Sequence, residues 1–327
     1  MLRRMTARLG VALISGAMIG LAAGAAAAAE NATGIYLLGF RGPLAGVTPP
    51  PGVYVENDIY LYDASVGGGR RLLLGGTLAA NVDGEAQLDA PSVIWVTPAQ
   101  VLGGQFGMTF TWPLGRTYAA AGTTIDSPVF GRNRGFISDE TSAIGDPLLS
   151  GFLGWNAGKF HWQAVAMLNI PVGDYRKDAL SNVAFHRWAG DLTGTFTWLD
   201  PETGIDLSAA AGFTFNGENP ETDYWTGTEF HLEWAATKSF GEFSLGLVGY
   251  HYQQVTGDGG SGATLGDFEG QVTALGGSVA YNFTLGTTPV TARLKVYREF
   301  AAENRLEGTS ALLTLSLPLS IDASHAD

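Results

Sequence analysis

The sequence has no cysteine and few charged residues, and after Glu30 it has no long apolar run. Without cysteine, the chain forms neither a disulfide framework nor a thiolate metal site. Charged residues make up 15% of the chain, which is low for a soluble domain. No segment after Glu30 approaches the roughly 20 apolar residues of a membrane-spanning helix. If the mature chain crosses a membrane, it therefore crosses as a closed β-barrel.

Basic residues are also scarce, with 18 Lys and Arg against 31 Asp and Glu, a net charge of −13. Removing Arg3, Arg4 and Arg8 with a leader segment takes −13 to −16. Such an acidic chain is a poor partner for nucleic acid. The same acidity fits the outer loops and lumen of a membrane barrel.

Residues 1–29 are predicted to be a signal peptide. A basic start is followed by the apolar run Leu9–Leu21 and by small residues that end in Ala27-Ala28-Ala29, a typical cleavage site. The alternative is a membrane anchor, but the apolar run is short and interrupted by glycine. We therefore expect export and cleavage before Glu30. If the exported chain is a closed barrel, its expected place is the outer membrane of a Gram-negative bacterium.

What the sequence has in abundance is alternation. Between Asp191 and Phe215, apolar and polar residues alternate in two arms around the turn Asp200–Gly204. A period of two places each set on one face of a strand, and the turn predicts an antiparallel hairpin. About twelve such segments follow one another over residues 53–319, separated by alternately short and long connections. Ser65–Glu85 and Arg116–Asp146 are the longest expected loops.

This pattern predicts an all-β fold, a transmembrane antiparallel barrel of about 12 strands followed by a polar tail at residues 320–327. A secreted β-sandwich also alternates, but it gives no reason for connections that alternate in length. Four tryptophans are expected near strand ends, as in an interfacial girdle, and a bulge is expected at Gly276-Gly277. The tryptophans are Trp112, Trp155, Trp198 and Trp234.

Residues 30–52 do not alternate and end in Pro49-Pro50-Pro51-Gly52. Proline cannot donate to a ladder, so this segment is not a central strand. It is either a linker or a plug inside the barrel mouth. Five closely spaced residues are too apolar for a solvated linker and are the expected plug residues: Ile35, Tyr36, Leu37, Leu38 and Phe40.

The polar face of the strands supplies the side chains expected to line the lumen. Ten are candidates for a substrate path: Tyr54, Glu56, Asp58, Tyr60, Tyr62, Glu229, His231, Glu233, Arg293 and Lys295. Asp89, Asp191, Asp206 and Glu299 are also expected to point inward. Arg293 and Lys295 are expected to pair with carboxylates across the lumen, which either stiffens the wall or sets a charge preference. The tyrosines offer aromatic surface to a solute, or simply fill the interior.

The histidines raise the question of catalysis. No G-x-S-x-G motif is present, and no serine is an obvious partner for His161 or His251. His231 lies between Glu229 and Glu233, but carboxylates on one strand do not close a metal site without a second strand. We therefore expect no enzyme activity, no metal and no cofactor.

Scattered motifs from Gly34 to Leu319 resemble the outer-membrane proteins of the "meta-pathway of phenol degradation" family, distantly similar to fatty-acid and aromatic-hydrocarbon channels. The motifs are Ala45-Gly46 with Pro49–Gly52, Pro171–Tyr175, the set Asn216, Asn219, Thr222, Tyr224 and Gly227, then Gly249-Tyr250, Gln253-Gln254, Gly257–Gly259, Gly266–Gly270, Glu303–Arg305 and Gly308. The resemblance implies a barrel and a role in the uptake of hydrophobic or aromatic compounds.

The predicted function is therefore a porin-like channel for passive uptake of small hydrophobic or aromatic compounds. Its expected partners are outer-membrane lipid, lipopolysaccharide and the solute. The alternative is a surface adhesin or structural barrel without a transport role.

Overall fold

The computed structural model describes residue 30 and residues 33–74, 77–127, 131–264, 266–267 and 269–321. This part of the chain forms one large antiparallel barrel and a two-stranded ribbon, without an α-helix. It has no helix long and apolar enough to cross a membrane. The predicted signal peptide, residues 1–29, lies outside the described residues. Ser320 and Ile321 belong to the last strand, and the rest of the predicted tail is not described.

Within the described residues, the barrel wall is built from fourteen strands, and β10 and β11 form the separate ribbon. The bounds are β1 Gly52–Leu74, β2 Thr77–Val101, β3 Gly104–Thr111, β4 Leu114–Ser127, β5 Gly131–Ile144, β6 Leu148–Ala157, β7 Phe160–Asn169, β8 Ala189–Asp200, β9 Ile205–Asn216, β10 Glu218–Asn219, β11 Tyr224–Trp225, β12 Glu229–Phe240, β13 Phe243–Gln254, β14 Gln271–Leu285, β15 Thr288–Glu303 and β16 Glu307–Ile321.

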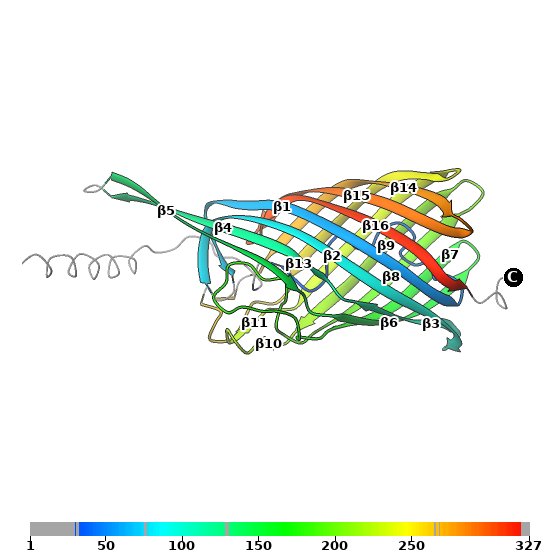
Figure 1. The fold of residues 1–327 in the computed structure, drawn as a ribbon, viewed down its shortest axis with the longest axis horizontal. Helices are drawn as coiled ribbons and strands as arrows, with labels where there is room; N and C mark the ends of the chain where they lie inside the picture. Colours follow the sequence, from blue (N-terminus) through cyan, green and yellow to red (C-terminus); the bar gives the residue numbers. More distant parts are fainter. Residues whose placement is uncertain are drawn as a thin grey trace, which may run out of the picture.

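Strand β1 closes the barrel because it pairs with β16 on one edge and with β2 on the other (Figure 1). Val55, for example, lies opposite Leu317 in β16 and opposite Val93 in β2. Closure removes the free edges that a sheet would otherwise expose. It also excludes the sandwich alternative, in which two separate sheets pack face to face.

At two positions around the barrel, two shorter strands lie end to end in the place of one continuous strand. β3 and β4 both pair with β2, and residues 112–113 separate them. β5 pairs with β4, β6 pairs with β3, and residues 145–147 separate these two. Pro113 and Pro147 lie at the two breaks, where a missing N–H interrupts the ladder. Counting each end-to-end pair once reduces 14 strands to 12 (14 − 2), which confirms the predicted size of the barrel.

Short turns gather at one end of the barrel, as predicted, but two of the expected long loops are wrong. Ser65–Glu85 belongs largely to β1 and β2, and Arg116–Asp146 largely to β4 and β5. Figure 1 shows the β4–β5 hairpin extending well beyond the rest of the wall. These residues alternate poorly because a hairpin that extends past the closed wall needs no apolar face. Their backbone groups are satisfied by pairing with each other.

The exterior of the barrel is apolar. Outward side chains that are more than 40% exposed include Trp95, Phe110, Phe196, Phe213, Leu245, Leu247, Leu275, Val296 and Phe300. Contact of so large an apolar surface with water would be strongly unfavourable, whereas such a surface is normal for a barrel in lipid. The interior carries the polar and tyrosine side chains, so the predicted assignment of the two faces is right for most of the wall.

Two details of the predicted wall are wrong. Trp155 and Trp198 lie near the short-turn end, but Trp234 lies within β12 with its ring over Gly249, and Trp112 lies at the break between β3 and β4. The register is unbroken at Gly276-Gly277, and the irregularity in β14 falls between Gln271 and Thr273. Glycine and other small residues occupy both faces of β14 there, so the sequence looks as if the alternation of apolar and polar residues shifted by one position.

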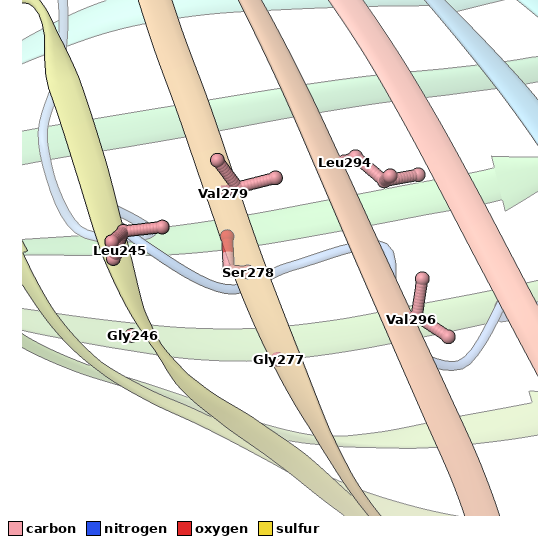
Figure 2. A pocket seen from close by; sticks show the side chains of 7 residues that line it. All are labelled: Leu245, Gly246, Gly277, Ser278, Val279, Leu294 and Val296. Carbon is pink, nitrogen blue, oxygen red and sulfur yellow. The ribbon is translucent and has the colours of Figure 1, made fainter.

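A groove of about 350 Å³ lies on the outer surface across β13, β14 and β15. Figure 2 shows its floor at Gly246 and Gly277, with apolar side chains around it: Leu245, Val279, Leu294 and Val296. The absence of a side chain at Gly277 creates the hollow. The groove faces away from the lumen, so it is separate from the candidate site.

Candidate functional site

Residues 33–51 are not part of the wall. Tight turns shape this segment, with backbone bonds from Phe40 N to Leu37 O (3.1 Å) and from Val47 N to Leu44 O (2.9 Å). It contacts inward side chains of β7, β8, β9, β12 and β15, described below, and it leads into β1 at the short-turn end. It therefore runs along the inside of the barrel. Of the five predicted plug residues, Ile35 and Leu38 are buried and the others are half-buried.

The middle of the segment is held at Gly39. Its N–H donates to Glu233 Oε1 at 2.8 Å, and its carbonyl accepts from Lys295 Nζ at 2.6 Å. Lys295 also donates to the carbonyl of Phe40 at 2.6 Å. Gly39 has a φ of +84°, and a Cβ at this position would lie 2.7 Å from the Tyr297 ring. Only glycine combines this conformation with so close an approach to the wall.

Three further strands hold the C-terminal half of the segment, around residues 44–47. Leu44 N donates to Asp206 Oδ2 in β9 at 3.0 Å. Gly46 N donates to Thr197 Oγ1 in β8 at 2.9 Å. Gln163 in β7 donates to the carbonyl of Val47 at 3.1 Å. Polar wall side chains thus satisfy backbone groups that would otherwise be unpaired inside the barrel.

His231 connects the segment to a buried acid. Its Nε2 lies 2.8 Å from Asp191 Oδ2, and Asp191 also accepts from the hydroxyl of Thr214 at 2.7 Å. The ring of Tyr36 stacks on the imidazole with centroids 3.5 Å apart. This arrangement fixes the imidazole against the segment. Among the described residues, no group of three or more side chains is placed to hold a metal ion.

All ten predicted lumen residues face inward, but they do not form one path. Tyr60 and Tyr62 belong to a large cluster in the barrel, while Tyr54 packs in a separate cluster with Val96, Phe152 and Val165. The expected pairing of Arg293 and Lys295 with carboxylates is wrong within the described residues, where no ion pair of either is within 4.0 Å. Both instead donate to carbonyls of the inner segment, Arg293 to Pro43 at 3.0 Å.

The prediction that Asp89 points inward is also wrong. Asp89 lies between Leu88 and Ala90, which both face the interior side of β2, and its carboxylate accepts from Asn57 on the outer face at 2.7 Å. Asp191, Asp206 and Glu299 do point inward and are buried.

One side of the lumen is aromatic. A cluster of buried side chains from β1 and β12–β16 includes Tyr60, Tyr250, Tyr252, Tyr297, Val248, Val272 and Leu312. Leu38 belongs to this cluster, and Tyr36, Leu37 and Phe40 pack against it. The inner segment therefore occupies an apolar, aromatic site that the wall would otherwise offer to another molecule.

Two of the tyrosine hydroxyls in this region, those of Tyr62 and Tyr250, share one acceptor. Glu299 accepts from Tyr62 at 2.7 Å, from Tyr250 at 2.8 Å and from the backbone N–H of Gly308 at 2.7 Å. The aromatic faces are thus turned to the lumen contents while their polar ends are satisfied at the wall.

Sequence reasoning missed the residues that hold the connections together at the end of the barrel opposite the short turns. Asp146, at the break between β5 and β6, accepts from Gly173 N and Phe185 N at 2.8 Å and from His186 N at 3.1 Å. It thereby folds the β7–β8 connection back over the mouth. Glu30 and Arg187 are buried there as well. The signal was present in the motif Pro171–Tyr175, whose Gly173 packs directly against Gly145 and Asp146.

Comparison with known proteins places the chain in a family. The family described as "Putative MetA-pathway of phenol degradation" matches residues 67–315, well over half of the sequence. This chain belongs to that family. The resemblance first indicated by the scattered motifs is therefore confirmed. A search of curated proteins finds no match.

A solved structure shares the fold, and two further structures match less well. A crystal structure of an outer membrane channel from Pseudomonas putida F1 matches 84% of this chain and 98% of its own, with 16% identity and a TM-score of 0.65. The translocator domain of the autotransporter NalP from Neisseria meningitidis matches at 12% identity, with 84% and 91% of the chains covered and a TM-score of 0.45. The monoaromatic hydrocarbon channel CymD matches at 9% identity, with 85% and 90% covered and a TM-score of 0.41.

Proposed function

We propose that this family member is an outer-membrane channel through which small hydrophobic or aromatic compounds pass passively. The observation that carries the proposal is the aromatic side of the lumen, which lies inside a barrel with a lipid-compatible exterior. A hydrophilic pore would have no use for a wall of buried tyrosine, valine and leucine. The fold match to a protein described as an outer membrane channel supports the same conclusion.

In this proposal, residues 30–52 are the plug. The segment fills the aromatic site with Leu38 and its neighbours, so a solute that reaches this site competes with those side chains. Burial of one such side chain stabilises the plugged state by about 1.5–3 kcal/mol. The solute offers comparable apolar surface, so exchange costs little and the plug acts as a displaceable occupant.

The location belongs to the same proposal. The protein reaches the outer membrane of a Gram-negative bacterium after cleavage before Glu30, and its partners are membrane lipid and lipopolysaccharide. The short-turn end, where β1 begins and β16 ends, faces the periplasm. The chain acts without a cofactor and is not an enzyme.

Uptake by whole cells tests the proposal. Cells that express the protein should accumulate radiolabelled toluene faster than cells without it, because lipopolysaccharide slows apolar solutes. A variant lacking residues 31–45 should accelerate uptake further. Equal uptake with and without the protein, at matched levels of folded barrel, would remove the proposal.

The β4–β5 hairpin favours a second candidate, a surface adhesin. It extends past the rest of the wall, and Phe136 and Ile137 on it are 66% and 54% exposed. Deleting residues 116–141 should then abolish attachment to a partner and leave solute uptake unchanged. Loss of uptake without loss of attachment would favour the channel.

A further inference from the structure

At the end of the barrel opposite the short turns, hydrogen-bond donors surround the buried carboxylate of Glu30. Glu30 is fully buried, and its carboxylate accepts from Thr222 Oγ1 at 2.8 Å, Asn219 Nδ2 at 2.9 Å and the Tyr175 hydroxyl at 3.3 Å. The donors come from two separate connections, β7–β8 and β9–β12. The donors therefore converge on Glu30 from loops that are distant in sequence and do not come from a single turn.

Arg187 lies beside Glu30 but does not donate a hydrogen bond to it. Its side chain is 0% exposed, and its Nη1 lies 3.9 Å from Glu30 Oε2, too far for a hydrogen bond. Neither terminal nitrogen has a hydrogen-bond partner among the described residues, whereas Nε donates to Asn216 Oδ1 at 3.1 Å. A buried guanidinium with unused donors is costly, and its planar fork matches a carboxylate. Glu30 therefore neutralises the charge without using the fork.

The walls of this pocket around Glu30 and Arg187 are aromatic. The Phe185 ring lies 5.2 Å from the Arg187 guanidinium carbon, and Tyr175 stacks on His186 with centroids 5.0 Å apart. Burial, together with the negative charge of Glu30, raises the pKa of Tyr175. Its hydroxyl therefore stays protonated at neutral pH and serves as a donor. The pocket thus combines a cation and neutral donors, which match a carboxylate, with flat apolar surfaces, which match an aromatic ring. A small aromatic acid carries both groups.

We propose that this pocket binds the carboxylate of an aromatic carboxylic acid, which replaces the Glu30 carboxylate and frees the outer end of the inner segment. The proposal rests on the proposed channel function and names one class of its solutes. One carboxylate leaves as another arrives, so Arg187 keeps a carboxylate beside it. The incoming group reaches both terminal nitrogens of Arg187. The contacts of Gly39 with Glu233 and Lys295 hold the rest of the segment in place during the exchange.

The absence of cysteine allows a direct test. A Thr33→Cys variant reports the release of the outer end as a faster reaction with a maleimide. We expect benzoate to accelerate labelling of the purified, folded barrel. Benzamide, which lacks the charge, should have no effect, and acetate, which lacks the ring, should need a concentration at least about tenfold higher.

Variants assign the effect to the pocket. Arg187→Met should abolish the response to benzoate, and Arg187→Lys should retain part of it. Glu30→Gln should lower the concentration of benzoate needed by about tenfold, because the competing charge is gone. Glu221→Gln, an exposed carboxylate in the same connection, should behave like the parent. Heat-modifiable gel migration shows which variants are folded. If Arg187→Met does not fold, the Glu30→Gln result and the ligand series decide.

Three outcomes would overturn the proposal: no response of the parent to benzoate, an unchanged response in folded Arg187→Met, or an equal response to inorganic phosphate. Uptake of toluene separates this failure from that of the channel. If toluene enters through the protein and benzoate has no effect, the pocket is not a solute site and the channel function stands. If benzoate acts through Arg187 and toluene does not enter, only the proposed function fails.

Discussion

Substituting Gly39 tests the plug by changing one Cβ atom. In Gly39→Ala, the new methyl group would lie 2.7 Å from the ring of Tyr297, which is 1% exposed and has no room to move. The φ of +84° also disfavours any residue with a side chain. We expect the segment to leave the wall, since the wall itself is held by its ladders.

The size of the effect follows from these two terms. A left-handed conformation costs an alanine about 1–2 kcal/mol. Overpacking a rigid site costs about 1–3 kcal/mol more. Together they destabilise the plugged state by roughly 2–5 kcal/mol, which raises the ratio of open to plugged barrels by roughly 30- to 4,000-fold. The contact of Gly39 with Lys295 weakens at the same time, so the lower value is conservative.

Gly42→Ala is the matched control for this experiment. A Cβ at Gly42 would lie 3.5 Å from the Lys295 side chain, an ordinary contact, and its φ is not in the left-handed region. Single-channel recording in planar bilayers measures the open probability of both variants. We expect frequent openings in Gly39→Ala and parent behaviour in Gly42→Ala. Identical recordings for the two variants would refute the argument that Gly39 docks the plug.

Three further predictions concern the segment, the mouth and the wall. Removing residues 31–45 should raise single-channel conductance without unfolding the barrel, and an unchanged conductance would make the segment a linker. Asp146→Ala leaves three backbone N–H groups without their acceptor, at about 1–3 kcal/mol each; trypsin should then cut at Arg176 and Lys177 at least about tenfold faster, and an unchanged rate would contradict the role of Asp146. Val279→Lys, on the outer face of β14, should destabilise the barrel in lipid by about 2–4 kcal/mol, and Leu285→Lys at the rim by about 0–1 kcal/mol, as measured by urea unfolding; equal losses would mean that the apolar face does not lie in the membrane.

The sequence by itself determined the class of fold and the direction of most wall side chains. A strand has a period of two, so a residue such as Lys295 or Glu233 on the polar face must point to the lumen once the wall closes. It also marked residues 35–40 as too apolar for solvent. These are local properties, and local patterns report them.

Local patterns were misleading where backbone pairing needs no amphipathic face. The β1–β2 and β4–β5 hairpins continue through stretches that alternate poorly, because their ladders are satisfied by each other. At Asp89 an acidic residue suggested the lumen, but its neighbours fix the phase of β2 and turn it outward. Chemical type is thus a weaker guide to direction than the phase of the whole strand.

Only the tertiary structure decided which inward groups meet. Lys295 and Arg293 donate to carbonyls of the inner segment and not to carboxylates on the wall, because the segment comes between them. Glu30 reaches Asn219 and Thr222, and approaches Arg187, only because the segment runs the length of the barrel and the loops fold over its end. Such contacts depend on closure of the whole wall and on the path of a segment without periodicity, and neither is written in the spacing of residues.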